Sequence, residues 1–305
     1  MTKFTAITIA GIIMTSALSA QNKNVNEAEP VISDGITGTV LRHIDFKPKQ
    51  LDARNVDVWL PPGYDPKSPE KYPVLYMHDG QNVFDPKTSF IGVDWGVDEA
   101  MTKLIADGKI KPAIVVAVWN AGMKRMIEYM PQKAFEKIKY QNVLTELLGR
   151  MKEKPESDNY LKFLVSELKP FIDSTYKTLS NTENTFIMGS SMGGLISAYA
   201  VCEYPAVFSG AGCISTHWPA GDGIMIDYMK ENLPDPASHK LYFDFGTQTL
   251  DALYEPYQKR MDEVMSNANW TENKNWITRK FEGEEHSERA WKKRIDIPLL
   301  FLLGK

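Results

Sequence analysis

The first half of the chain shows two kinds of hydrophobic pattern that predict strands. Apolar and polar residues alternate over residues 36–46 and 55–60, as they do in strands with one face exposed to solvent. Residues 72–77 and 113–119 are continuously apolar instead, which is typical of strands buried on both faces. Between these two runs, the apolar spacing over residues 97–106 predicts an amphipathic helix.

The second half continues this alternation of strands and helices. Charged residues with a helical pattern fill 132–155, and an amphipathic helix is predicted over 160–176. Near-continuous apolar strands separated by helices favour an α/β fold, with a mostly parallel central sheet and helices on both faces. Because no repeat, low-complexity tract or interdomain linker is visible, we expect one domain over residues 36–305. The remaining predicted elements are strands at 186–188, 210–215, 241–245 and 276–281, and a helix at 194–203.

The N-terminus has the features of a targeting segment. Lys3 supplies a positive charge, residues 4–14 form a short apolar core, and residues 17–20 are small enough for a cleavage site. This pattern predicts a signal peptide over residues 1–20, followed by a polar, proline-containing flexible leader over 21–35. The apolar core is too short to remain as a membrane anchor. We therefore expect a secreted or periplasmic protein with no stable membrane anchor.

Charge and cysteine content restrict the partners. The 305 residues contain 35 Lys and Arg against 39 Asp and Glu, with no basic run, so a nucleic-acid partner is not expected. Of the two cysteines, Cys202 and Cys213, neither has a His or Cys at a metal-binding spacing, and we expect neither a metal site nor a cofactor. Two buried free thiols are favoured over a disulfide, although an oxidising compartment permits one.

A nucleophile is predicted in the segment Gly189-Ser190-Ser191-Met192-Gly193. The segment lies between a predicted strand and a predicted helix, which is the context of a Gly-x-Ser-x-Gly nucleophile elbow. The sharp turn projects the central hydroxyl above the sheet, and the flanking glycines avoid collisions with the neighbouring strand or helix. The alternative, a phosphate-binding turn, lacks the lysine of a P-loop. We therefore assign Ser191 as the nucleophile.

A serine nucleophile requires a base, usually a histidine oriented by a carboxylate. With the elbow in mid-chain, the expected order is serine, acid, histidine. Of the five histidines, only His286 follows the last predicted strand, and we assign it as the base. His43 lies in an early strand and His239 precedes a strand, whereas His78 and His217 follow strands and are candidates to line the cleft.

The acid is expected after the penultimate strand. Asp251, in the loop that follows residues 241–245, is favoured, with Asp244 and Glu255 as alternatives. A strand-terminal Asp244 is a plausible structural acceptor, and Glu255 lies at the predicted start of a helix.

The tetrahedral intermediate of acyl transfer also needs two backbone donors. One is the amide of Met192, directly after the nucleophile. The other is expected in the loop after residues 72–77, where Gln81 is favoured over Asn82.

Several motifs together resemble the putative esterase family, which includes esterase D-like enzymes, ferric-enterobactin esterases, and feruloyl or acetylxylan esterases of carbohydrate esterase family one. The resemblance covers residues 37–304 and implies an α/β-hydrolase fold with serine esterase chemistry. It supports Ser191 and His286 firmly, and Asp251 less firmly, because the acid loop varies most. The matching motifs are His78-Asp-Gly-Gln-Asn-Val-Phe-Asp85, Asn120 through Arg125 to Glu128-Tyr129, Gly189-Ser-Ser-Met-Gly-Gly194 and Glu285-His286-Ser287.

Substrate-binding residues are predicted from the loops at the catalytic end of the sheet. Trp95, Tyr129 and Trp218 are candidates to stack on a sugar or catecholate ring, or else to be core aromatics. Arg125 either binds an acidic substrate group or pairs with Glu128, three residues on. The segment 132–155 is either a lid or a surface insertion.

The leading hypothesis is a secreted serine esterase that forms an acyl-enzyme on Ser191. Feruloyl or acetyl esters of plant polysaccharide are the preferred substrates, so the partner is a small-molecule or polysaccharide-linked ester. Siderophore lactones and acyl transfer to a sugar are alternatives within the same chemistry. A non-catalytic carbohydrate-binding protein is the alternative from another class.

Overall fold

The computed structural model describes residues 28–305. The predicted signal peptide and the first part of the predicted leader lie outside the described residues. Within the described part of the chain, no helix is both long and apolar enough to cross a bilayer.

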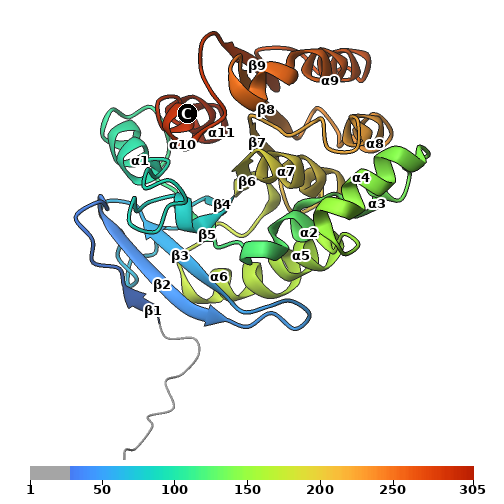
Figure 1. The fold of residues 1–305 in the computed structure, drawn as a ribbon. Coiled ribbons are helices and arrows are strands. Elements are labelled where there is room, and N and C mark those ends of the chain that lie inside the picture. Colours follow the sequence, from blue (N-terminus) through green and yellow to red (C-terminus); the bar gives the residue numbers. More distant parts are fainter. Residues whose placement is uncertain (1–27) are drawn as a thin grey trace, which may run out of the picture.

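A nine-stranded sheet forms the centre of the molecule (Figure 1), with the strand order β1-β2-β3-β5-β4-β6-β7-β8-β9. The first four strands in this order pair antiparallel, and all pairs from β5 through β9 are parallel. The mostly parallel α/β architecture is thus as predicted. The strands are β1 Ala28–Pro30, β2 Thr39–Phe46, β3 Arg54–Leu60, β4 Val74–His78, β5 Ile114–Val118, β6 Thr185–Ser190, β7 Gly210–Ile214, β8 Lys240–Gly246 and β9 Trp276–Phe281.

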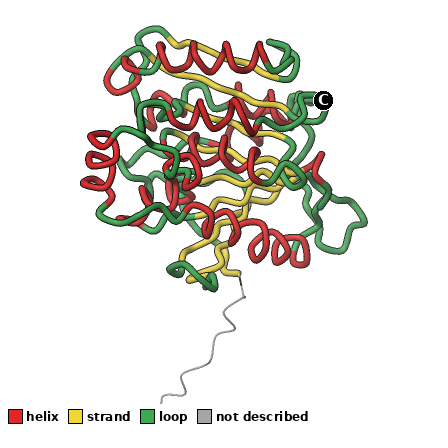
Figure 2. Tube along the Cα trace, turned by 90° about the vertical axis from the view of Figure 1, so that its right-hand side faces the viewer, coloured by secondary structure: helices red, strands yellow, loops and turns green. Residues whose placement is uncertain are grey.

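Helices cover both faces of the sheet, as the tube view from the side also shows (Figure 2). The α-helices are α1 Val97–Ala106, α2 Arg125–Tyr129, α3 Gln132–Phe135, α4 Gln141–Met151, α5 Ser157–Phe163, α6 Lys169–Thr175, α7 Met192–Glu203, α8 Ile224–Asn232, α9 Glu255–Asn267, α10 Glu288–Lys292 and α11 Asp296–Leu303. Single turns of other helix types are η1 Gly80–Asn82, η2 Gly122–Lys124, η3 Leu164–Leu168, η4 Thr182–Asn184 and η5 Thr249–Leu253.

The buried strands divide the core in two, because successive side chains of a strand point to opposite faces. On β4, Val74 and Tyr76 pack into the core under α5 to α9, which is the larger of the two. Leu75 and Met77 pack into the other core, with α1, α10 and α11. All four side chains are at most 1% exposed, which explains why the strand is apolar throughout.

Two predictions about local structure are corrected by the model. The leader was expected to be flexible to residue 35, but Ala28–Pro30 pairs with β2 as an edge strand, from Ala28 opposite His43 to Pro30 opposite Leu41. The helix predicted over 160–176 is interrupted by a π-helical turn, Leu164–Leu168. Pro170 follows this turn, and because proline has no amide hydrogen it cannot continue the regular bonding pattern of an α-helix.

Cys202 and Cys213 are both free thiols, as favoured, although only Cys213 is buried and Cys202 is partly exposed. Burial raises the pKa of both thiols, so neither is an activated nucleophile.

Candidate active site

Ser191 occupies the sharp turn between β6 and α7. Its backbone angles, φ 57° and ψ −120°, lie in a region that side-chain-bearing residues rarely adopt. The turn is held by a bond from Ser191 N to Ile214 O of β7, at 2.9 Å. A Cβ atom on Gly189 would lie 2.8 Å from the backbone of Gly193, so the chain can fold back this tightly only with glycine there. The strained conformation is the one expected of a nucleophile elbow.

His286 and Asp251 are brought together by the loops after β9 and β8. The Nδ1 atom of His286 lies 2.6 Å from Oδ1 of Asp251. The same two loops are joined by a bond of 2.9 Å from His286 N to Thr249 Oγ1. The residues are 35 positions apart in sequence, so the sheet topology and not local structure creates the pair.

The second oxygen of Asp251 accepts two hydrogen bonds of its own. Gly246 N donates to Oδ2 at 2.6 Å, and Ser215 Oγ donates to it at 2.7 Å. Burial opposes ionisation of this carboxyl group, but the bonds from His286, Ser215 and Gly246 outweigh burial and lower the pKa of Asp251. The group is therefore a carboxylate at neutral pH.

The direction of the Ser215 bond is fixed by its other partners. Ser215 Oγ accepts from Trp291 Nε1 at 3.0 Å and from Arg294 Nη2 at 2.9 Å. Both partners are obligate donors, so the serine hydrogen is left to point at Asp251. Sequence reasoning did not find Ser215, since a buried serine at a strand end carries no recognisable signal.

The two alternatives for the acid have different partners. Asp244 forms a buried ion pair with Arg294, at 3.0 Å, and also accepts a bond from Tyr242. Glu255 pairs with Lys259 and Lys280 at the surface. The structure therefore brings Asp251, and neither of the two alternatives, to His286.

Ser191 and His286 line one cavity of about 790 Å³. Such a volume lies in the range of small-molecule sites. The His286 ring packs nearly perpendicular to two aromatic neighbours, with ring centroids 5.0 Å from Trp291 and 5.7 Å from Tyr254. The other described lining residues are Asp79, Gln81, Asn82, Phe90, Ile91, Asn120, Gly122, Met123, Arg125, Ser190, Glu285, Ser287, Glu288, Arg289 and Trp291.

Half-buried His217 and buried Tyr254 form a hydrogen-bonded pair next to Ser191. Nδ1 of His217 lies 2.7 Å from the Tyr254 hydroxyl, and His217 N donates to Ser191 O at 3.2 Å. Burial, followed by the charge of His286, lowers the pKa of His217 to about 4, so this imidazole is neutral. Burial raises the pKa of Tyr254, against a smaller lowering by its hydrogen bond with Ser191. Tyr254 was not singled out in the sequence, and neither His217 nor His78 is among the described residues that line the cavity.

The two residues expected to supply oxyanion donors lie in α7 and in η1. Met192 is the first residue of α7, where amide groups have no acceptor within their own helix. Gln81 lies in η1, directly after β4, and lines the cavity. A Cβ on Gly80 would lie 2.6 Å from the carbonyl group of Ala117, so η1 packs closely on β5.

Arg125 and Glu128 do not pair with each other, which corrects one sequence expectation. Glu128 forms a fully buried ion pair with Arg54, at 2.6 Å. Arg125 lines the cavity but binds Asp79 with two bonds, from Nε to Oδ1 at 2.6 Å and from Nη2 to Oδ2 at 2.7 Å. Both true partners are too far away in sequence to be recognised by helical spacing.

The three aromatic candidates for substrate stacking are core residues instead. Trp95 and Trp218 are each 1% exposed, and Tyr129 is 0% exposed. Trp95 packs edge-on against Trp291, and Trp218 donates from its indole to Gln258 at 2.8 Å. Because their rings have no free face, the expectation that they contact substrate is wrong.

Three other apolar side chains line the mouth of the cavity. Of the nine large apolar residues exposed in residues 28–305, Phe90, Ile91 and Met123 all line the Ser191 cavity, at 84%, 37% and 91% exposure. Phe90 and Ile91 come from the loop after η1, and Met123 comes from η2, after β5. Exposed apolar residues gathered in one place indicate a binding surface.

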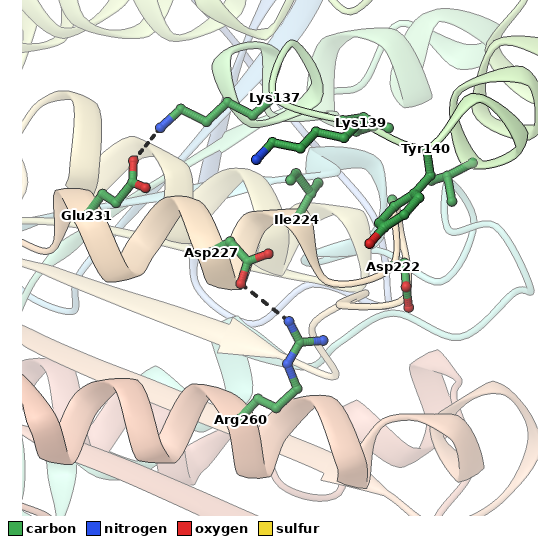
Figure 3. Close-up of a pocket in the computed structure, with 11 residues that line it drawn as sticks. Lys137, Lys139, Tyr140, Asp222, Ile224, Asp227, Glu231 and Arg260 are labelled. Atoms are coloured by element: carbon green, nitrogen blue, oxygen red, sulfur yellow. Dashed lines mark hydrogen bonds and ion pairs between the residues drawn. The ribbon is translucent and has the colours of Figure 1, made fainter.

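The segment 132–155 supplies none of the described residues that line the Ser191 cavity. Part of it borders a separate cavity of about 430 Å³ between the α3–α4 connection, α8 and α9 (Figure 3). Ion pairs cross this second cavity, from Lys137 to Glu231 and from Arg260 to Asp227. The segment is therefore not a lid over Ser191 in this conformation.

A group of three carboxylates, Asp94, Asp98 and Glu99, lies at the start of α1. Lys292 lies 2.9 Å from Asp94 and 3.5 Å from Glu99, so an ammonium group already balances part of this charge. We assign no metal to the group.

Comparison with known proteins gives a consistent picture. Residues 51–297 match the family described as "Putative esterase". An endo-1,4-beta-xylanase/feruloyl esterase of Xylanibacter ruminicola is 28% identical over 193 residues, which are 62% of this chain and 22% of that protein. The aligned part of this chain thus spans about a fifth of that relative's length. The ferri-bacillibactin esterase BesA of Bacillus subtilis is 23% identical over 195 residues, covering 60% of each chain.

The architecture is shared with solved structures. A ferulic acid esterase superposes with a TM-score of 0.61 at 18% identity, covering 87% of this chain and 97% of its own. At that identity the likeness establishes the fold, while the family match covers most of the chain and establishes the family. The chain belongs to the putative esterase family and has an α/β-hydrolase fold.

Proposed function

We propose that this protein is a serine esterase that hydrolyses its substrate through an acyl-enzyme on Ser191. The observation that carries the proposal is the strained Ser191 turn, which opens into the same cavity as His286, the imidazole held by Asp251. A serine at such a turn, a histidine and a buried carboxylate are the parts that acyl transfer requires.

In the proposed first step, Ser191 Oγ attacks the ester carbonyl carbon and His286 Nε2 accepts the serine proton. Asp251 holds the other ring nitrogen as a donor, so that Nε2 is free to accept. The amides of Met192 and Gln81 stabilise the negative oxygen that forms. When this intermediate collapses, His286 returns the proton to the departing alcohol. Water then repeats the sequence on the acyl-enzyme and releases the acid.

The proposed substrate carries an aromatic acyl group, such as feruloyl, on a plant polysaccharide. Phe90, Ile91 and Met123 offer an apolar surface beside the reactive serine, which an acetyl group is too small to use. The similarity to a protein named as a feruloyl esterase supports this choice. Acetyl esters are the alternative within the same mechanism.

The charges in the cavity argue against a siderophore lactone. The described lining residues include three carboxyl groups, of Asp79, Glu285 and Glu288, and two guanidinium groups, of Arg125 and Arg289. A ferric tris-catecholate is an anion, and a cavity without a positive excess does not attract it. We therefore favour a neutral ester, although several similar proteins, BesA among them, are siderophore esterases by name.

Hydrolysis is favoured over the remaining alternatives. A binding protein has no need of the strained elbow or of a buried carboxylate aligned on His286. Acyl transfer to a sugar would require a second sugar site besides the acyl site. The signal-peptide pattern at residues 1–20 supports secretion to the cell exterior or periplasm.

The test is hydrolysis by wild type and by Ser191→Ala, together with labelling by a fluorophosphonate. Wild type should be labelled once per chain and should hydrolyse 4-nitrophenyl acetate, and Ser191→Ala should lose both properties by at least about 1,000-fold. Ser266→Ala, at an exposed serine of α9, is the matched control and should behave as wild type. Labelling of Ser191→Ala at the wild-type level would refute the proposal.

The acyl preference is tested separately, with methyl ferulate and 4-nitrophenyl acetate. Replacing Met123 by Ser should lower kcat/KM for the ferulate by about tenfold, as expected for the loss of one buried apolar contact, and change the acetate value by less than about twofold. Equal losses on the two esters would contradict an aromatic acyl site. Leu250→Ser, at another exposed apolar position, serves as the control.

A further inference from the structure

The loop that carries Gln81 begins with a buried carboxylate that the triad does not use. Asp79 is 1% exposed and has left-handed backbone angles, φ 56° and ψ 46°. Its carboxylate accepts two bonds from Arg125, at 2.6 and 2.7 Å, and a third from Asn120 Nδ2 at 2.7 Å. Arg125 and Asn120 both follow β5, so Asp79 ties the loop after β4 to the loop after β5.

Two further bonds join the same loops. The Gln81 side chain accepts a bond from Asn120 N, at 3.2 Å, and Asp79 N donates to the Tyr129 hydroxyl, also at 3.2 Å. The guanidinium of Arg125 lies over the Tyr129 ring, 5.1 Å from its centroid. The backbone at Asp79 and Gln81 is therefore fixed from outside η1, mainly through Arg125 and Asn120.

The carboxylate of Asp79 also lies against the start of α7. A Cβ atom on Gly193 would be 3.3 Å from Asp79 Oδ2, and Gly193 is two residues after the nucleophile. Reaction at Ser191 creates a negative oxygen near this helix end. An unneutralised buried carboxylate here would repel that oxygen strongly, because charges interact more strongly away from water.

Arg125 supplies the neutralising charge. Burial alone would lower the pKa of Arg125, but the charge and hydrogen bonds of Asp79 outweigh burial and raise it. The guanidinium is thus permanently charged, and its two parallel bonds fix the carboxylate in position as well as in charge.

We propose that Asp79 and Arg125 are positioning residues for the oxyanion site. The pair holds η1 so that the Gln81 amide points at the reacting oxygen, and Arg125 cancels the charge that Asp79 places beside α7. This inference rests on the proposed serine-esterase function. It gives Arg125 a role within the protein in place of the binding of an acidic substrate group.

The two halves of the pair should have strongly non-additive effects on kcat. Arg125→Ala leaves Asp79 buried and unneutralised, and kcat should fall by about 100-fold or more, as for loss of an oxyanion donor, with KM changed by less than about threefold. Asp79→Asn removes the charge and keeps a residue that tolerates the left-handed conformation, so kcat should fall by less than about tenfold. In Asp79→Asn/Arg125→Ala no charge is left unpaired, and kcat should be at least about tenfold higher than in Arg125→Ala.

Arg150→Ala is the matched control. Arg150 lies on α4, is not among the described residues that line the Ser191 cavity, is 62% exposed and pairs with Glu146, so its loss should change kcat by less than about twofold. Millimolar guanidinium should restore part of the activity of Arg125→Ala, because the site opens into the cavity, and should do nothing for Arg150→Ala. Arg125→Lys keeps the positive charge with fewer hydrogen bonds, so it should retain more activity than Arg125→Ala. It also allows the test to be made if Arg125→Ala does not fold.

The outcomes separate this inference from the proposed function. If wild type shows no Ser191-dependent turnover, both fail. If wild type is active and the Asp79 and Arg125 effects simply multiply, the inference alone fails. It also fails if Arg125→Ala raises KM and leaves kcat unchanged, in a variant whose thermal unfolding and fluorophosphonate labelling show that it is folded. That result would make Arg125 a substrate-binding residue.

Discussion

Asparagine at position 251 should inactivate the enzyme by fixing the wrong tautomer of His286. Gly246 N and Ser215 Oγ both donate to Oδ2 of Asp251, and Trp291 and Arg294 prevent the serine hydroxyl from reversing. The amide oxygen of asparagine must therefore take the Oδ2 position. Its NH₂ group then points at His286 Nδ1, which can bond it only as an acceptor.

The cost follows from where the proton then resides. With Nδ1 as an acceptor, the neutral ring carries its proton on Nε2, the atom that must accept the Ser191 proton. A comparable substitution in a serine protease triad lowers kcat by about 10⁴-fold, or about 5.5 kcal/mol in the activation barrier. We expect an effect of this size for Asp251→Asn, with thermal stability close to that of wild type because the asparagine occupies the same space.

The assay is steady-state hydrolysis of 4-nitrophenyl acetate between about pH 5 and about pH 9. Asp251 should stay ionised across this range, because hydrogen bonds lower its pKa. Asp244→Asn is the contrasting variant: it should lower thermal stability by breaking the buried pair with Arg294, by about 3–5 kcal/mol, and reduce kcat far less. Glu255→Gln, at the surface, should have little effect on either quantity. If Asp251→Asn kept more than about a hundredth of wild-type kcat, the tautomer argument would be refuted.

Three further predictions concern the loop after β4, the start of α1 and the mechanism. Gly80→Ala should lower the free energy of unfolding by about 1–3 kcal/mol and lower kcat by at least about tenfold, because the new Cβ would meet the Ala117 carbonyl at 2.6 Å and displace η1. An unchanged kcat would contradict this expectation. Burial, followed by the hydrogen bond with Glu99, raises the pKa of Asp98 from 3.8 to about 8. Between about pH 4 and about pH 8 the folded protein therefore keeps a proton that the unfolded chain releases, and the stability of the fold falls as the pH rises through this range. The side chain of Asp98→Asn can still accept the bond from Thr37 N, but it does not titrate. In urea titrations the free energy of unfolding of this variant, relative to wild type, should therefore increase from about pH 4 to about pH 8. A difference between the two proteins that does not change with pH would count against the argument. EDTA should leave ester hydrolysis unchanged, because proton transfer between Ser191 and His286 needs no metal; activity that is lost to EDTA and restored by a divalent ion would refute the serine mechanism.

The sequence predicted the elements with strong periodicity. The expected bounds of α1 and β9 agree with the structure, and the other predicted strands overlap the observed ones. Strand β1 was missed because three polar-flanked residues carry no pattern, and only pairing with β2 makes Ala28–Pro30 a strand. Pairing of distant segments, which sequence periodicity does not report, also determines the strand order.

At the candidate site, the residues whose roles depend on local context were the easier ones to predict. Ser191 was recognised from a five-residue turn, whereas the choice of Asp251 over Asp244 depends on which carboxylate reaches His286 in space. The wrong predictions mostly concern burial. Trp95 and Trp218 lie in the expected loops, but their side chains are buried in the core. Their exposure depends on contacts with residues far along the chain, which spacing within the loop does not reveal.

The position of each triad residue in the strand order has a consequence for how activity is lost. Ser191 follows β6, in the middle of the sheet, while Asp251 follows β8 and His286 follows β9, the strand at the open edge. Of the six residues of β9, only Trp276 is buried, and Arg279 and Lys280 are exposed, so little buried surface opposes detachment of the strand. Local opening at this edge removes the base while the nucleophile turn stays intact. Mild heat or denaturant should therefore abolish turnover reversibly, before the bulk of the helical signal changes.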